Sequence, residues 1–230
     1  MNFFWELRRG KKGKAAVPSF WLQYLEKCTE AASHRKLPIE QGDFVVLDTE
    51  TTGLLLKKDR ILSIGAIRVR NSEMDLSQSY ECFINQGVPV KQDTIAVHGI
   101  LPGTKSTNIE EQEAIEQFVN FLGGAVIVGH HIAFDIEMIN HALKRMGLPK
   151  LRNKSLDTGT LAQRLEWKTS LQPADEYSLD KICKKFDIRL HDRHTAMGDA
   201  YITAILFQKL IWRLQQRGVK TMRDLLKRRR

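Results

Sequence analysis

The sequence has few cysteines and no long apolar run. Its three cysteines, Cys28, Cys82 and Cys183, are scattered without metal-ligand spacing, and an odd number argues against a disulfide framework. No apolar stretch approaches the roughly 20 residues that a membrane helix needs, and the first residues lack the apolar core of a secretory signal. We therefore expect reduced cysteines, no membrane span and a cytoplasmic protein.

A shortage of acidic residues is confined to the two ends of the chain. The net charge is +9, and it divides unevenly: residues 1–40 carry eight Lys/Arg and four Asp/Glu, residues 213–230 carry eight and one, and residues 41–212 carry twenty and twenty-two. Basic ends attract polyanions by neutralising phosphates, but the same charges are typical of a solvated helix end. Charge alone thus favours nucleic-acid contact without establishing it.

The order of predicted elements indicates an α/β fold. Three strand-like segments come first, at 44–47, 61–70 and 76–84, and short connections predict that they form an antiparallel meander. Strands and helices then alternate, which predicts a mixed sheet flanked by helices. The later elements are helices near 109–122, 134–146, 178–187 and 198–217, and strands near 125–130 and 155–158.

We divide the chain into three segments. Residues 1–40 form a basic, aromatic N-terminal extension, in which Trp21 and Tyr24 begin the spacing of a short amphipathic helix. Residues 41–212 form the central domain. Residues 213–230 form a basic, helical C-terminal tail.

The stretch FVVLDTETTGL, residues 44–54, ends an apolar strand with two acids. Side chains alternate along a strand, so Asp48 and Glu50 share a face about 6.5 to 7 Å apart while Thr49 points the other way. The strand breaks at Thr51, Thr52 and Gly53, which places both acids at its C-terminal end, where sites of α/β sheets commonly lie. Solvated surface acids are the ordinary alternative.

Two helices each begin with an acid on their apolar stripe. Asp135 aligns with the apolar residues of 134–146, whereas Glu137 falls on the polar side. Asp199 likewise heads the stripe of 198–217. Burying such charges without partners is costly, so either nearby lysines pair with them or an oxygen-binding ion such as Mg²⁺ or Mn²⁺ lies among them.

Histidines accompany these acids. His194 precedes Asp199 by five residues, where an imidazole could take a proton from a water, and His191 competes for this role. A single histidine is nevertheless more often structural. His130 and His131 end a predicted strand and either line the site or simply pack.

Three motifs together resemble a known family. DTETTGL, GHHIAFDIEMI and RHTAMGD are similar to the exonuclease motifs of the DEDDh 3′-to-5′ exonucleases, the DNA polymerase III epsilon-subunit-like branch of the ribonuclease H-like superfamily. The resemblance covers about residues 43–212. It implies a ribonuclease H-like mixed sheet and metal ligands at four acids: Asp48, Glu50, Asp135 and Asp199.

The resemblance also implies further roles. It places the general base at His194 and substrate contacts at Thr51, Leu54 and His98, the last within AVHGI. The chain departs from the family at His131, where asparagine is common.

The resemblance implies the chemistry of a two-metal nuclease. Two Mg²⁺ or Mn²⁺ ions, about 4 Å apart in sites of this kind, would overcome the repulsion between the acids and a phosphodiester. The expected reaction removes nucleoside 5′-monophosphates from single-stranded DNA 3′ ends in proofreading or repair, with a DNA polymerase subunit as a candidate partner. Arg189 and Arg193 are candidate phosphate contacts. The alternatives are an exoribonuclease of the same family and a non-catalytic nucleic-acid-binding subunit.

Overall fold

The computed structural model of the chain describes residues 17–88, 90, 92–100, 108–166 and 174–227. Six strands form one mixed sheet in the order β4-β3-β2-β1-β5-β6. The strands are β1 (Asp43–Thr51), β2 (Ile61–Arg70), β3 (Glu73–Asn85), β4 (Asn108–Glu110), β5 (Val126–Gly129) and β6 (Ser155–Asp157). The predicted α/β fold with a mixed sheet is confirmed.

The predicted meander is confirmed by the pairing of the first three strands. β1 and β3 both run antiparallel to β2, whereas β5 pairs with β1, β6 with β5 and β4 with β3 in parallel. In the β1–β2 register Asp48 lies opposite Gly65 and Glu50 opposite Ser63, and the register shifts between Glu50 and Thr51. The acids therefore lie where regular pairing ends.

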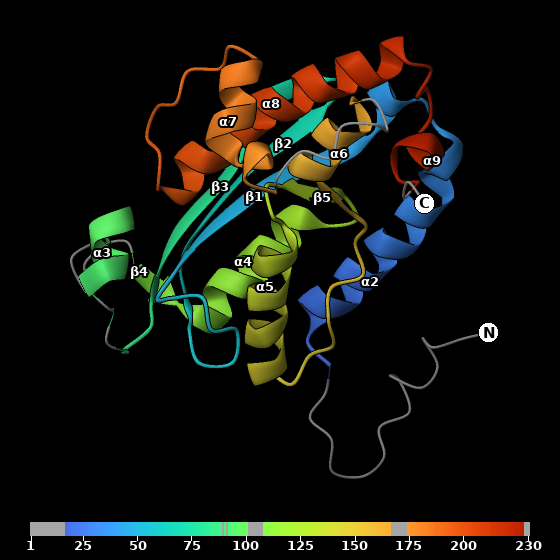
Figure 1. The fold of residues 1–230 in the computed structure, drawn as a ribbon. Coiled ribbons are helices and arrows are strands. Elements are labelled where there is room, and N and C mark those ends of the chain that lie inside the picture. Colours follow the sequence, from blue (N-terminus) through green and yellow to red (C-terminus); the bar gives the residue numbers. More distant parts are fainter. Residues whose placement is uncertain (1–16, 89, 91, 101–107, 167–173, 228–230) are drawn as a thin grey trace.

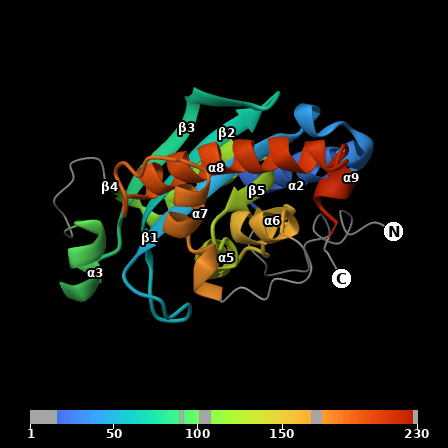
Figure 2. The ribbon, with the colours of Figure 1, turned by 45° about the horizontal axis from the view of Figure 1, so that its top comes forward.

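Helices cover both faces of the sheet (Figures 1 and 2). On one face lie α2 (Ser19–Ala31), α4 (Glu111–Leu122) and α5 (Ala133–Arg145); on the other lie α6 (Thr158–Arg164), α7 (Leu179–Lys185) and α8 (Ala196–Gln216). The short helices are α3 (Gln92–His98), α9 (Met222–Leu225), η1 (Ala32–Lys36), η2 (Ile39–Gln41) and η3 (Ala174–Tyr177). None of the described helices combines the length and apolarity needed to cross a membrane.

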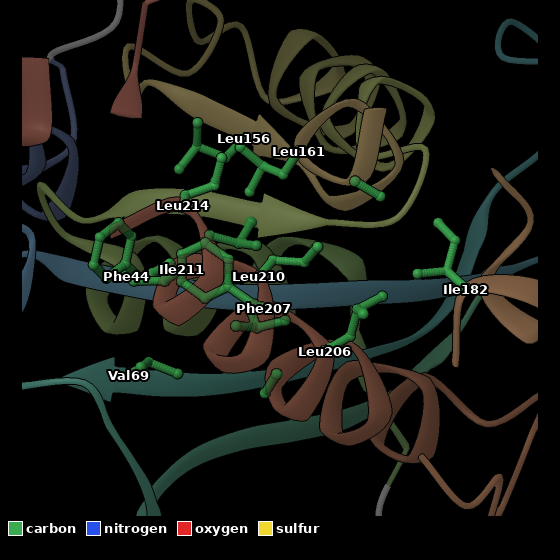
Figure 3. Close-up of a cluster of buried hydrophobic side chains, with 14 of the residues drawn as sticks. Phe44, Val69, Leu156, Leu161, Ile182, Leu206, Phe207, Leu210, Ile211 and Leu214 are labelled. Atoms are coloured by element: carbon green, nitrogen blue, oxygen red, sulfur yellow. The ribbon is translucent and has the colours of Figure 1, made fainter. Parts of the chain in front are cut away.

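The alternation of β1 divides its side chains between two hydrophobic cores. Phe44 and Val46 pack on the side of α8, and the rings of Phe44 and Phe207 lie 5.0 Å apart in the core that Figure 3 shows. Val45 and Leu47 point to the opposite core, which contains residues of α2, α4 and α5. Asp48 and Glu50 continue the first series, so they face α8, and Thr49 continues the second.

The predicted amphipathic helix near the N-terminus is confirmed as α2. Trp21 and Tyr24 are buried, and their rings lie 4.7 Å apart. The Tyr24 hydroxyl donates to the Asn153 side chain over 2.7 Å. The helix is thus fastened to the segment that leads into β6.

The end of the described chain also contributes to a core. α8 continues through residue 212, so the expected boundary at that position falls inside an unbroken helix. Met222 and Leu225 of α9 are buried, and Thr221 forms a capping box with Asp224. Six short elements were not predicted: α3, β4, α6, η1, η2 and η3.

Candidate active site

Three of the predicted acids meet at the end of β1. Asp48, Glu50 and Asp199 each offer a carboxylate oxygen, and these oxygens lie within 4.8 Å of one another. Two come from β1 and the third from the first turn of α8, which packs on the face toward which both strand acids point. Three oxygen donors at this spacing can bind a divalent cation such as Mg²⁺ or Mn²⁺.

A glycine allows α8 to approach the strand acids. Gly65 of β2 is the cross-strand partner of Asp48, and a Cβ atom added there would overlap the backbone of Ala196 and Met197. The start of α8 therefore rests directly on the β2 backbone, which brings Asp199 next to Asp48. Sequence analysis missed this residue, although a glycine inside a strand often marks a close backbone approach.

Arg193 and the backbone of His194 hold the Asp199 carboxylate. The Arg193 guanidinium forms an ion pair with Asp199 Oδ1, and its Nε donates to Asp180 Oδ1 over 2.9 Å. The His194 N–H donates to Asp199 Oδ2 over 3.2 Å. Arg193, expected to contact phosphate, thus lies within the acidic cluster and supplies positive charge there.

Asp135 approaches from the other face of the sheet. It is buried in the first turn of α5, and its Oδ1 accepts a hydrogen bond from the Thr49 hydroxyl over 2.6 Å. Thr49 points away from Asp48 and Glu50, so Asp135 joins the other acids only around the end of the strand. Asp135 is not among the three acids whose oxygens lie within 4.8 Å of one another, but its charge is close enough to raise the pKa of Asp48.

Burial and mutual repulsion make these acids hard to ionise. Burial, followed by the charges of Asp135, Asp199 and Glu50, raises the pKa of Asp48 well above its usual range. Burial, followed by the charges of Asp199 and Asp135, raises the pKa of Glu50 to about 7. Burial also raises the pKa of Asp135 to about 7, although the Thr49 hydrogen bond opposes the shift. A bound cation would relieve this cost, so the electrostatics fit a metal site.

The histidines differ in their surroundings. His194 is exposed, directly precedes the α8 N-cap residue Thr195, and has a left-handed φ of 64°. His191 is exposed as well. His130 Nδ1 shares a hydrogen bond of 2.8 Å with the Thr158 hydroxyl, and burial lowers the pKa of His130 to about 4. His131 is exposed, and its ring contacts the His130 ring at 4.5 Å.

Leu54, an expected substrate contact, lies on a braced loop. Its side chain is 80% exposed. Asp59, which sequence analysis missed, accepts hydrogen bonds from the Thr52 hydroxyl over 3.0 Å and from the Leu55 N–H over 2.7 Å. Thr51 is buried, and its hydroxyl donates to the Gly53 carbonyl over 2.8 Å. The loop therefore presents Leu54 outward on a fixed support.

His98 lines a cavity of about 690 Å³ that reaches the start of α8. Its Nδ1 accepts from the Ile100 N–H over 2.9 Å, and burial lowers its pKa. Its Nε2 is buried without a hydrogen-bond partner among the described residues, and so is the hydroxyl of Ser63, which lines the same cavity. Ser63 is the cross-strand partner of Glu50, so its unsatisfied hydroxyl lies beside the acids.

Comparison with known proteins identifies similar sequences. A family model described as Exonuclease (RNase_T) matches residues 45–207. A DNA polymerase III PolC-type from Caldanaerobacter subterraneus is 32% identical over 185 residues, covering 80% of this chain and 13% of that protein. A DNA polymerase III subunit epsilon-like protein from Rhodobacter capsulatus is 34% identical over 192 residues, covering 82% of this chain and 26% of that protein. The chain thus spans a small part of these relatives.

Solved structures share the fold. The ExoI–ssDNA complex from E. coli has a TM-score of 0.66 at 19% identity, covering 77% of this chain and 42% of that chain. Exonuclease X in complex with 5′ overhanging duplex DNA has a TM-score of 0.59 at 22% identity, covering 80% of this chain and 99% of that chain.

Proposed function

Because the chain belongs to the exonuclease family whose model spans residues 45–207, we propose that it hydrolyses DNA from the 3′ end to nucleoside 5′-monophosphates. The observation that carries this proposal is the oxygen cluster of Asp48, Glu50 and Asp199, whose repulsion a cation would relieve. The DNA polymerase relatives support the choice of DNA.

We assign the cluster the task of holding two divalent ions, Mg²⁺ or Mn²⁺, with Asp135 as a fourth ligand. When bound, such ions supply Lewis-acid stabilisation of the charge that develops on the phosphoryl group. His194, exposed beside Asp199, accepts the proton of the attacking water on a ring nitrogen. The water oxygen bonds to phosphorus, and the bond to the 3′ oxygen of the preceding nucleotide breaks; this oxygen leaves with the bonding electrons and takes a proton from solvent.

The substrate-side residues then hold the terminal nucleotide. Leu54 offers an exposed apolar surface to a base or sugar, and the buried polar atoms of His98 and Ser63 offer hydrogen bonds at the cavity wall. Thr51 contributes backbone at the same strand end. Base–apolar stacking of this kind tolerates any sequence, as an exonuclease requires.

The decisive experiment measures degradation of a 5′-labelled single-stranded DNA with Mg²⁺, Mn²⁺ or EDTA. We expect stepwise shortening of the labelled strand that needs a divalent ion and disappears in Asp135→Asn. The matched control is Glu137→Gln, since this acid on the same helix pairs at the surface with Lys150 over 3.0 Å. Activity that persists in EDTA, or equal loss in both variants, would overturn the proposal; matched RNA tests the sugar preference.

Association with a DNA polymerase is a further part of the proposal. It is supported by the relatives, which are named as polymerase III proteins. A proofreading role predicts faster removal of a mispaired than of a paired primer terminus. Equal rates on both termini would argue for general degradation instead.

A further inference from the structure

A second cavity lies at the opposite end of β1 from the acids. Its volume is about 700 Å³, and its lining includes residues of α2, η1, the start of β1, the end of β2, the segment 152–154 and α9. Figures 1 and 2 both show α2 and α9 at this end of the sheet. From Asp43 at this end to Asp48 the strand rises about 17 Å, so the two sites are separate.

The walls of this cavity are fixed by specific contacts. Asn153 accepts from the Tyr24 hydroxyl and donates to the carbonyl groups of Gly123 and Ala125 over 2.9 and 2.7 Å. The Arg152 N–H donates to the Tyr24 hydroxyl over 2.6 Å. These bonds hold the segment of Arg152 and Lys154 against α2, which carries Lys27.

Two glycines let neighbouring elements close around the cavity. A Cβ atom at Gly124 would overlap the backbone of Lys27 and lie 2.9 Å from the Ala31 side chain. A Cβ atom at Gly42 would lie 2.7 Å from Met222 Sδ of α9. The cavity is therefore a consequence of defined packing.

Positive charge dominates the lining. Five basic residues border the cavity against the acids Glu30 and Asp43; they are Lys27, Arg68, Arg70, Arg152 and Lys154. Arg68 and Arg70 already neutralise Asp43, over 2.7 and 2.8 Å. The lining as a whole thus has three more basic than acidic residues.

One wall of the cavity is partly apolar. The Arg68 guanidinium carbon lies 5.0 Å from the centre of the Phe121 ring, and Arg68 also donates to the Phe121 carbonyl. Cys28 and Val126 add further apolar surface. Basic groups beside apolar surface fit a ligand that has an anionic group and an apolar part.

We propose that this cavity binds a nucleoside monophosphate through its phosphate monoester. The volume falls within the range of about 300–1,000 Å³ typical of small-ligand pockets, and clustered Lys and Arg side chains are the common partners of phosphate. The identification of the ligand as a nucleotide rests on the proposed function, whose product it would be, whereas the site rests on shape and charge. The phosphate monoester can belong to a free nucleotide or to the 5′ end of a strand.

Calorimetric titration of the Asp48→Asn/Asp199→Asn protein in EDTA tests this site without the catalytic one. The probes are dTMP, thymidine and a 5′-phosphorylated oligonucleotide. We expect dTMP to bind and thymidine to bind far more weakly; binding of the oligonucleotide would show that a strand end is also accepted. Equal binding of dTMP and thymidine, or no binding of either phosphate-bearing probe, would overturn the proposal.

Charge-removing variants locate the binding. Lys27→Gln/Lys154→Gln should weaken dTMP binding at least about tenfold, as expected for the loss of charge-assisted hydrogen bonds. Lys150→Gln, near the same segment but paired with Glu137, is the matched control and should change binding less than about twofold. Unchanged binding in the double variant would refute the site, even if the protein is an active nuclease. Conversely, an inactive protein can still bind dTMP here.

Discussion

The acids at the two ends of β1 have neighbours of opposite charge. At the start of the strand, Asp43 accepts hydrogen bonds from both Arg68 and Arg70. At the end, Asp48 and Glu50 converge with Asp199, while Arg193 supplies a single guanidinium to the cluster. In the first arrangement one carboxylate is paired with two guanidinium groups, and the second is a concentration of like charge. The contrast teaches that counting cations around a strand acid separates a structural role from a functional one.

The largest expected effect comes from neutralising the unbalanced end. Asp48→Asn should lower the rate of nucleotide release by more than about 100-fold, since the loss of even an indirect partner of a metal ligand costs 10–100-fold. The same change removes repulsion, so the melting temperature without metal should rise at pH 7. Activity near that of the wild type would contradict a functional role for the acids at the end of β1.

Gly65→Ala should have the next largest effect. The added methyl group would overlap the backbone at the start of α8, so Asp199 must move away from Asp48. We expect a loss of activity of about 10–100-fold, comparable to the loss of a residue that orients a metal ligand. Gln78→Ala on the neighbouring strand β3, at an exposed position outside the cavity, is the control and should leave the rate unchanged.

A change at the start of β1, where Asp43 is paired with two arginines, should affect stability rather than activity. Asp43→Asn leaves the buried Arg68 guanidinium without its charged partner and should reduce the free energy of unfolding by about 2 kcal/mol. Nucleotide release should remain within twofold of the wild type at a temperature where both proteins are folded. Urea unfolding and the nuclease assay measure the two effects; lost activity in the folded variant would contradict the contrast.

The pH dependence of stability provides a smaller test. The pKa values of Glu50 and Asp135 are raised to about 7, above the values of about 4 expected in the unfolded chain. The folded state therefore binds more protons in this range, and the metal-free protein should lose stability as the pH rises from about 4 to about 7. Glu50→Gln should flatten this slope in thermal melts, whereas Asp43→Asn should not.

The smallest expected effect concerns the three arginines at the end of the chain. Removing residues 228–230 should reduce the salt dependence of binding to single-stranded DNA by at most about two units of slope, because each phosphate contact contributes about 0.7. A deletion from residue 219 would be a poor test, since Met222 and Leu225 are buried. An unchanged slope would assign binding to other basic residues.

Local periodicity predicted much of the candidate site. The alternation of FVVLDTETT placed Asp48 and Glu50 on one face, and the helical stripes correctly predicted that Asp135 and Asp199 are buried. The stripe of a helix shows which side faces the protein, but it does not show which face of the sheet the helix covers. The sequence therefore could not predict that Asp135 approaches from the side of Thr49.

Contacts between distant segments explain the remaining omissions. The role of Gly65 depends on the crossing of α8 over β2, and the pairing of Arg193 with Asp199 depends on the path of the loop before that helix. The packing of α9 against the core was not predicted because its buried Met222 and Leu225 lie among basic residues in a four-residue helix. Neither kind of feature leaves a periodic signal in the sequence.

Because side chains of β1 alternate between the two faces of the sheet, an insertion or deletion within this strand would move its functional side chains to the wrong face. Asp48 and Glu50 serve one side of the sheet while Thr49, between them, tethers Asp135 on the other. One inserted residue upstream of Asp48 would exchange these assignments, turning both carboxylates toward α5 and the hydroxyl toward α8. We therefore expect an inserted residue to be tolerated better in the loop beyond Thr51, where pairing with β2 has already lost its regular register.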